Sequence, residues 1–176
     1  MQNAVQSKPP PLGRVAFPSN GAAKSDVVVK RITVVLANDD KFVRKGLRAL
    51  LEAELDMEVV GEANNGRQAV KLAVALYPDV VVMDITMLLL SGRETTRHIL
   101  QAHPASKLIV LSTYDDDAYV EHAMVSGVAG YLLITTSSRD LAAAIRAVKN
   151  GRTYFCCSIA KRFLHARAEQ SVQEHD

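Results

Sequence analysis

Several features that define other protein classes are scarce in this sequence. It has only two cysteines, Cys156 and Cys157, and because they are adjacent they indicate neither a disulfide framework nor a zinc site. No apolar run approaches the roughly 18–20 residues that a membrane-spanning helix needs. The N-terminal residues lack the apolar stretch of roughly 7–15 residues found in a secretory signal. We therefore expect a cytoplasmic protein that does not contact a membrane.

The sequence also lacks a large excess of charge of either sign. The 176 residues carry a net charge of only +2, and this charge is unevenly distributed. Residues 1–31 hold five basic side chains against Asp26, a sum of +4, which leaves −2 for the remainder. A nucleic-acid-binding domain usually shows the opposite arrangement, a folded body with a basic face. We expect no direct binding of nucleic acid by this chain.

Three regions are expected along the chain. Residues 1–30 contain three consecutive prolines and no sustained helical or strand period, which predicts a flexible leader. Residues 31–151 carry regular apolar periods and are expected to form the one folded domain. Residues 152–176 are predicted to form a short amphipathic helix, from Ser158 to His165, and a polar tail.

The apolar periods of residues 31–151 indicate a fold. Short β-branched runs typical of buried strands alternate with amphipathic helical periods. The expected strands lie at 32–37, 57–63, 80–83, 108–111 and 128–133, and the expected helices at 43–51, 69–76, 93–102, 115 onward and 138–150. This alternation predicts a flavodoxin-like α/β fold, a doubly wound five-stranded parallel sheet with helices on both faces. The functional groups of such a fold lie at the carboxyl ends of the strands.

Polar residues follow three of the predicted strands. Asn38, Asp39 and Asp40 follow the first strand, Asp84 ends the third, and Ser112 ends the fourth. Neighbouring carboxylates at one edge of a sheet make a hard oxygen site suited to Mg²⁺ or Mn²⁺. Each residue also has an ordinary alternative role, as a helix N-cap or a turn residue. Their common position at one edge of the sheet favours a functional site.

Five stretches together resemble the response-regulator receiver domain of two-component systems, in particular the branch usually joined to LuxR-type helix-turn-helix domains. They are ITVVLANDDKFVRKGLRALLE (32–52), EVVGEANNGRQAV (58–70), PDVVVMDI (78–85), LIVLS (108–112) and GVAGYLL (127–133). The intervals between motif positions agree too: 45 residues from Asp39 to Asp84, 28 more to Ser112 and 22 more to Ile134. The resemblance covers residues 32–150.

The resemblance implies a role for each matching residue. Asp84 would be the phosphoacceptor, receiving its phosphoryl group in a phosphorelay from a sensor histidine kinase or a phosphotransfer protein. Asp39, Asp84 and the backbone carbonyl of Thr86 would bind Mg²⁺ or Mn²⁺. Ser112 would bond to a phosphoryl oxygen, and Tyr131 would follow it by moving its ring between exposed and buried positions. The domain would signal through protein–protein contacts, and no enzyme activity is expected beyond self-catalysed phosphotransfer and dephosphorylation.

Three positions depart from the family's pattern. Asn38 replaces the first of two adjacent acids, so it would hold the metal weakly or through a water. Ile134 replaces a lysine whose ammonium pairs with the acceptor aspartate. A charge pair at about 4 Å is worth on the order of 4 kcal/mol at an effective dielectric near 20, before desolvation. Leu88 stands where proline is usual. Lys41 is a candidate substitute for the missing ammonium, or an ordinary solvated lysine.

These departures leave two hypotheses open. The chain is a phosphoaccepting receiver, or a degenerate pseudo-receiver, a binding module used without phosphorylation. A haloacid-dehalogenase-type phosphatase is disfavoured because it needs an aspartate where Thr86 stands, and a flavodoxin because Asp39 and Asp40 would repel its phosphate. The 25 residues after Gly151 are fewer than the roughly 50 of a second domain, so we expect a stand-alone receiver or a fragment. A two-fold homodimer is a further expectation.

Overall fold

The computed structural model of the chain describes residues 30–114, 116–135 and 138–155. Within them, six parallel strands form one sheet in the order β2-β1-β3-β4-β5-β6. The strands are β1 (Ile32–Ala37), β2 (Met57–Ala63), β3 (Val80–Asp84), β4 (Lys107–Ser112), β5 (Gly130–Leu133) and β6 (Tyr154–Phe155). The helices are α1 (Lys41–Glu52), α2 (Gly66–Leu76), α3 (Ile85–Ala102), α4 (Asp117–Val125) and α5 (Ser138–Lys149).

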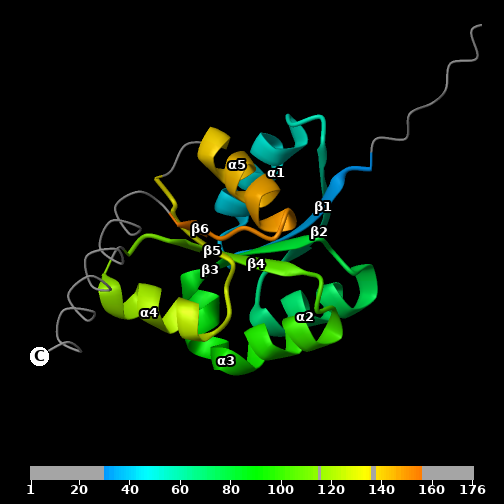
Figure 1. Cartoon of the computed structure of the whole chain (residues 1–176). Helices are drawn as coiled ribbons and strands as arrows, with labels where there is room; N and C mark the ends of the chain where they lie inside the picture. The colour runs from blue at the N-terminus through cyan, green and yellow to red at the C-terminus, as the bar shows by residue number, and fades with distance from the viewer. Residues whose placement is uncertain (1–29, 115, 136–137, 156–176) are drawn as a thin grey trace, which may run out of the picture.

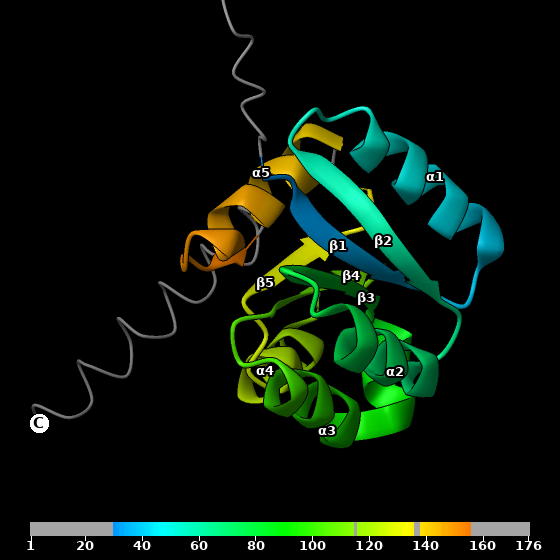
Figure 2. The ribbon, with the colours of Figure 1, turned by 90° about the vertical axis from the view of Figure 1, so that its right-hand side faces the viewer.

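The sheet is covered by helices on both faces. Helices α1 and α5 lie on one face, and α2, α3 and α4 lie on the other (Figures 1 and 2). Successive residues of a strand point to opposite faces, so the strands buried on both sides read as continuous apolar runs. Val34 and Val35 show this, since each is fully buried but in a different core cluster. The predicted flavodoxin-like doubly wound fold is confirmed.

The predicted start of the third helix was wrong. The expected range was 93–102, whereas α3 begins at Ile85, directly after β3. Asp84 is the N-cap of this helix, and its side chain accepts a hydrogen bond from the backbone N–H of Thr86. A helix that starts at Ile85 uses the backbone N–H of residue 88, which leucine supplies and the family's usual proline would not. The replacement of proline by Leu88 therefore permits the longer helix.

A sixth strand was not anticipated by the sequence analysis. Tyr154 and Phe155 pair in parallel with Gly130 and Tyr131 of β5, so the sheet continues past the expected domain boundary at residue 151. Tyr154 packs against the core on the α1 and α5 side, and Phe155 packs against the opposite core. The expected leader lies outside the described residues apart from its last residue, and the expected helix at 158–165 lies wholly outside them.

A half-buried carboxylate joins three elements at the amino-terminal end of the sheet. Asp79, just before β3, accepts hydrogen bonds from the backbone N–H and the hydroxyl of Thr33 on β1, at 3.0 and 3.2 Å. It also forms an ion pair with Lys149 of α5. Burial raises the pKa of Asp79, but the bonds from Lys149 and Thr33 outweigh it and hold the pKa below its ordinary value.

Replacing Asp79 by Asn should lower the free energy of unfolding at pH 7 by about 1–3 kcal/mol. Because the pKa of Asp79 is lower in the folded chain than in the unfolded one, its contribution is present above the unfolded pKa of about 3.9 and is lost as pH falls through the folded value. Urea unfolding at a series of pH values should therefore show the two proteins converging in acid. The exposed Asp116, which caps α4 without a side-chain hydrogen bond, gives the matched control Asp116→Asn.

Candidate functional site

The ends of three neighbouring strands bring the predicted site residues together. Strand β3 lies between β1 and β4, so Asn38, Asp84 and Ser112 emerge at the same edge of the sheet. The side-chain amide of Asn38 donates a hydrogen bond from Nδ2 to Oδ2 of Asp84 at 2.9 Å. Asn38 and Ser112 are buried, and Asp84 is half-buried. This edge is the expected location of a functional site in a doubly wound fold.

The carboxylate of Asp84 is held by three donors. Oδ1 accepts from the backbone N–H of Thr86 at 2.7 Å and from the Thr86 hydroxyl at 2.6 Å. Among the described residues, Oδ2 accepts only the bond from Asn38. A carboxylate oxygen has two lone-pair positions, so Oδ1 is fully engaged and Oδ2 keeps one position open. Oδ2 is therefore the oxygen of Asp84 that remains able to bind or attack.

An arginine fixes the backbone at the end of β1. Nη1 of Arg44 donates to the carbonyl oxygens of Asn38 and Asp39, at 2.6 and 3.3 Å. Glu62 of β2 holds Arg44 through an ion pair of 3.4 Å and Arg48 through one of 2.8 Å. The bond from Arg48, with the weaker one from Arg44, keeps the pKa of Glu62 below its ordinary value. Arg44 was not predicted to have a role, because a cation that binds backbone carbonyls leaves no motif in the sequence.

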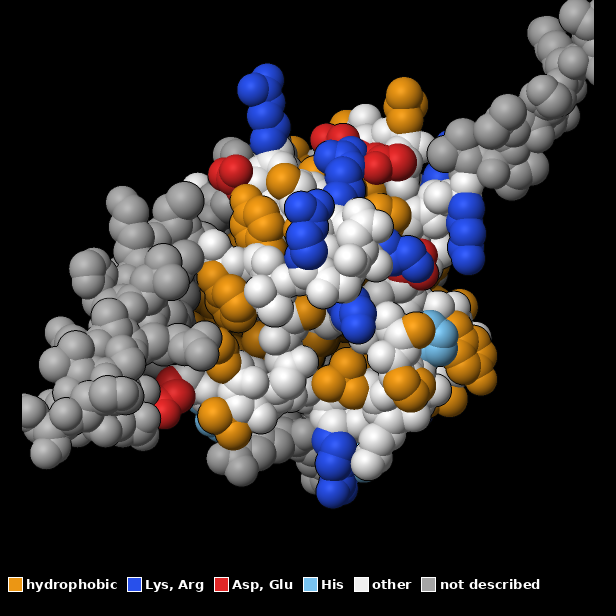
Figure 3. Space-filling model, viewed as in Figure 1, with side chains coloured by type: hydrophobic (Ala, Val, Ile, Leu, Met, Phe, Trp, Pro, Cys, Tyr) orange, Lys and Arg blue, Asp and Glu red, His pale blue; other side chains and the backbone are white. Residues whose placement is uncertain are grey.

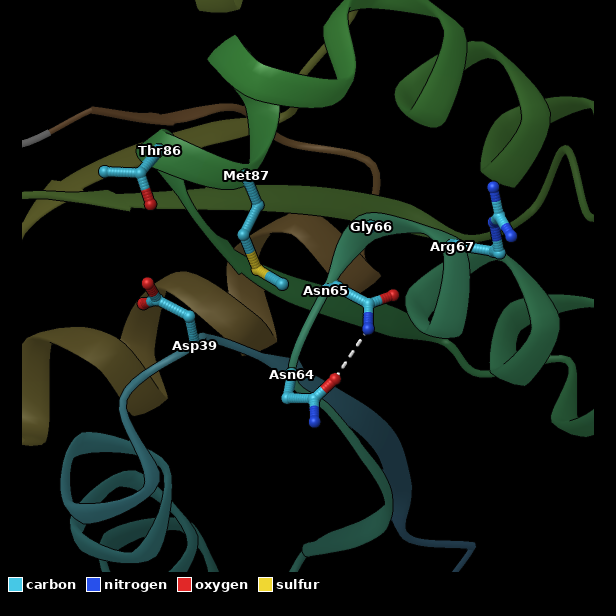
Figure 4. Close-up of a pocket in the computed structure, with 7 residues that line it drawn as sticks. All are labelled: Asp39, Asn64, Asn65, Gly66, Arg67, Thr86 and Met87. Atoms are coloured by element: carbon cyan, nitrogen blue, oxygen red, sulfur yellow. Dashed lines mark hydrogen bonds between the residues drawn. The ribbon is translucent and has the colours of Figure 1, made fainter.

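An open pocket of about 520 Å³ lies at the end of β1, where Asp39 forms part of its lining. Figure 4 shows Asp39, the Thr86 hydroxyl and the side chain of Met87 directed into a common space, with Asn65 at its side. Arg67 borders the pocket, but its guanidinium points away from Asp39 (Figure 4). The Arg67 guanidinium therefore does not face the negative charge of Asp39. The Asp39 side chain is exposed, so a ligand from solution can reach it.

The predicted metal ligands are only partly arranged for a metal. The carboxylates of Asp39 and Asp84 can act as metal ligands, because Mg²⁺ is often bound by one or two carboxylates together with waters. Asn38 is not arranged as a ligand, since it turns its NH₂ group toward Asp84. Thr86 lies in the first turn of α3, where backbone carbonyls point along the helix away from its N-terminus. Among the described residues, no group of three or more His, Cys, Asp or Glu side chains could hold a metal ion. The donor set fits a weakly held, hydrated Mg²⁺.

The two predicted switch residues are connected through one backbone segment. The hydroxyl of Ser112 accepts from the backbone N–H of Tyr114 at 2.8 Å, and the Tyr131 hydroxyl donates to the carbonyl oxygen of Tyr114 at 2.9 Å. The ring of Tyr131 is fully buried, and the ring of Tyr114 stacks on that of Tyr119 with 4.8 Å between centroids. Tyr114, which the sequence analysis did not single out, therefore links Ser112 to Tyr131.

The altered lysine position lies at the end of β5. Ile134 is half-buried, and its backbone N–H donates to the carbonyl oxygen of Ser112 at 2.8 Å. Its side chain offers neither charge nor hydrogen bond to Asp84. Lys41, the candidate substitute, is exposed at the first residue of α1.

Comparison with known proteins agrees with this geometry. The family model described as the response regulator receiver domain matches residues 34–146, and the chain belongs to this family. It is 41% identical over 133 residues to the transcriptional regulatory protein LiaR of Bacillus subtilis, covering 76% of this chain and 63% of that protein. It is 37% identical over 145 residues to the uncharacterized transcriptional regulatory protein YxjL of the same organism, covering 82% of this chain and 66% of that one.

Solved structures give the same result for the fold. A two-component response regulator of the LuxR family from Aurantimonas sp. SI85-9A1 matches with a TM-score of 0.72 and 31% identity, covering 79% of this chain and 99% of that one. The chain spans between about half and two thirds of the length of the first curated relatives, 52–66%. No helix among the described residues is long and apolar enough to cross a membrane.

The Thr86 hydroxyl should contribute measurably to the geometry of the site. Replacing Thr86 by Val removes this donor to Asp84 with little change in shape, and should lower the free energy of unfolding by about 1 kcal/mol. Thr86→Ser keeps the hydroxyl and serves as the control, so it should lose clearly less. Urea unfolding of the three proteins measures the difference. Equal stability of the Val and Ser variants would show that the hydrogen bond is unimportant.

Proposed function

We propose that this chain is a receiver that accepts a phosphoryl group on Asp84 in a two-component phosphorelay. The observation that carries the proposal is the arrangement of Asp84 at the carboxyl end of β3, held by protein donors with one lone pair of Oδ2 open. In the transfer, Oδ2 attacks phosphorus in line, an oxygen–phosphorus bond forms, and the bond from phosphorus to the donor's histidine nitrogen breaks. The electron pair of that bond returns to the imidazole, and the product is an acyl phosphate.

The residues around Asp84 support this chemistry in two ways. Phosphoryl transfer depends mainly on positioning and on electrostatic stabilisation of the transferred oxygens. Thr86 and Asn38 position the carboxylate, and the N-terminus of α3 favours negative charge at Asp84. When Mg²⁺ is bound through Asp39 and Asp84, it would neutralise charge on the phosphoryl oxygens. The domain acts in this proposal as a phosphoacceptor, with self-catalysed phosphotransfer and dephosphorylation as its only catalysis.

The signal would pass from Asp84 to the surface through Ser112. If the Ser112 hydroxyl turns to a phosphoryl oxygen, it releases the backbone N–H of Tyr114, whose carbonyl oxygen holds Tyr131. The surface formed by α4, β5 and α5 would then change and bind a partner. A sensor histidine kinase or phosphotransfer protein is the proposed donor, a homodimer is a proposed form, and the cytoplasm is the proposed compartment.

Direct binding of nucleic acid is not part of the proposal. On the face shown in Figure 3, the described Lys and Arg side chains are scattered and interleaved with acidic groups, and form no continuous basic stripe. Such a stripe is what phosphate-backbone binding requires. Proteins of this branch usually act on DNA through a separate helix-turn-helix domain, and the described residues form only the receiver.

One observation favours the alternative of a pseudo-receiver. Ile134 cannot bind a phosphoryl group, so the coupling between Asp84 and β5 that a lysine gives in the family is missing. In that alternative the same surface binds its partner without phosphorylation.

Labelling with a small-molecule phosphodonor separates the two functions. Incubation of the full chain with acetyl phosphate or phosphoramidate and Mg²⁺ should add one phosphoryl group, read by intact mass. Asp84→Asn should abolish the addition, because an amide oxygen is a poor nucleophile, whereas Asp116→Asn should label normally. An unlabelled wild-type protein would favour the pseudo-receiver.

The missing lysine should matter more for switching than for labelling. A ligand shifts a two-state element only by its differential contact with the two states, and Ile134 gives a phosphoryl group no such contact. Ile134→Lys should therefore enlarge the phosphodonor-dependent change in amide exchange over residues 112–140, with little effect on the extent of labelling. Equal changes in both proteins would show that the lysine position is irrelevant to switching.

A further inference from the structure

Asn38 uses every polar group it has. Its backbone N–H donates to the carbonyl oxygen of Ala63 at 3.0 Å, and its own carbonyl oxygen accepts from Arg44 at 2.6 Å. Its side-chain Oδ1 accepts from the backbone N–H of Asp40 at 2.8 Å, and Nδ2 donates to Asp84 at 2.9 Å. The residue is only 3% exposed. A buried amide whose oxygen and nitrogen both have a partner is held in one orientation.

The orientation of this amide has a chemical cause. A backbone N–H can only donate, so the group of Asn38 that faces Asp40 must be the oxygen. The NH₂ group then necessarily faces the carboxylate of Asp84. The reversed amide would place NH₂ against N–H and oxygen against carboxylate, which loses both bonds.

The donors to Asp84 are all neutral. Among the described residues they are the amide of Asn38 and the backbone and hydroxyl of Thr86. At the end of β5, where the family supplies an ammonium, Ile134 supplies none. The described residues therefore position the acceptor carboxylate without a cation.

We propose that Asn38 is a positioning residue for Asp84, and that its amide takes over the hydrogen bond that a lysine gives in the family. Asn38 and Ile134 are then a matched pair of substitutions: the loss of the ammonium is tolerated because the neighbouring acid has become a donor. This inference rests on the proposed role of Asp84 as the phosphoacceptor.

The pairing has a specific consequence for an acid at position 38. Asn38→Asp keeps an oxygen for the Asp40 N–H, so the local turn survives, but it replaces the donor at 2.9 Å from Asp84 by a carboxylate oxygen. Two carboxylates at this distance repel each other unless a cation lies between or beside them. To keep its thermal stability, the Asn38→Asp variant should therefore need either a bound metal or the family's lysine. The wild-type chain should need neither.

The test is a thermal-unfolding comparison of the full 176-residue chain in EDTA and in Mg²⁺. The variants are Asn38→Asp, Ile134→Lys and the double variant, with Asn64→Asp as the matched control. Asn64 borders the pocket beside Asp39 and gains the same charge, but its side-chain oxygen accepts a hydrogen bond from Asn65, and within the described part of the chain it makes none with Asp84 (Figure 4).

In EDTA, Asn38→Asp should lower the Tm by about 5 °C or more, and Asn64→Asp should change it little. Either Mg²⁺ or the added Ile134→Lys substitution should restore most of the loss. The Mg²⁺-dependent rise in Tm should also be larger for Asn38→Asp than for the wild type. Restoration by a cation is what a positioning role predicts and what a purely structural role would not give.

The proposal is overturned if Asn38→Asp is as stable in EDTA as the Asn64 control, or if neither Mg²⁺ nor the lysine restores a lowered Tm. If Asn38→Asp does not fold in EDTA, the double variant decides: a folded double variant supports the pairing, and an unfolded one refutes it. Phosphodonor labelling of the same samples keeps the two proposals apart. Absence of labelling in every variant counts against phosphoacceptance, while the Tm values still decide the role of Asn38.

Discussion

The position of β3 between β1 and β4 is the constraint on which the site depends. In a parallel sheet the carboxyl ends of neighbouring strands meet at one edge, so this order brings Asn38, Asp84 and Ser112 together although they are far apart in the sequence. The central strand β3 is apolar and buried from Val80 to Met83, and its one polar residue, Asp84, ends the strand. The candidate site therefore consists of the residues at which β1, β3 and β4 end.

Asp84 combines two roles that do not compete. As the N-cap of α3 it uses Oδ1, which binds the backbone N–H and the hydroxyl of Thr86. The proposed attack on phosphorus uses Oδ2, whose one partner in the described part of the chain is Asn38. A phosphoryl group on Oδ2 can therefore leave the cap intact, and α3 need not unwind when the site is modified. The added negative charge would also lie at the positive end of the helix dipole.

The sequence predicted those features that depend on periodicity and on residue type. Apolar periods were sufficient for the first five strands and the layers of helices, and polar residues at strand ends were sufficient to locate the site. The start of α3 was missed because the pattern of the chain predicted a helix only from residue 93, whereas Asp84 caps a helix that begins at Ile85. The orientation of the Asn38 amide could not be predicted, because it follows from the position of the Asp40 N–H in space. The role of Arg44 was missed for the same reason.

The acidic edge strand β2 has a consequence for how this sheet meets other chains. An exposed edge strand offers unpaired backbone groups on which a foreign strand can template itself, and proteins protect such edges with charge or with very short strands. At one edge of this sheet, β2 carries Glu58 and Glu62. At the other, Tyr154 and Phe155 occupy the pairing positions beside Gly130 and Tyr131, and they are the last residues that the structure describes. The acidic side chains of β2 therefore discourage a foreign strand from extending the sheet at that border.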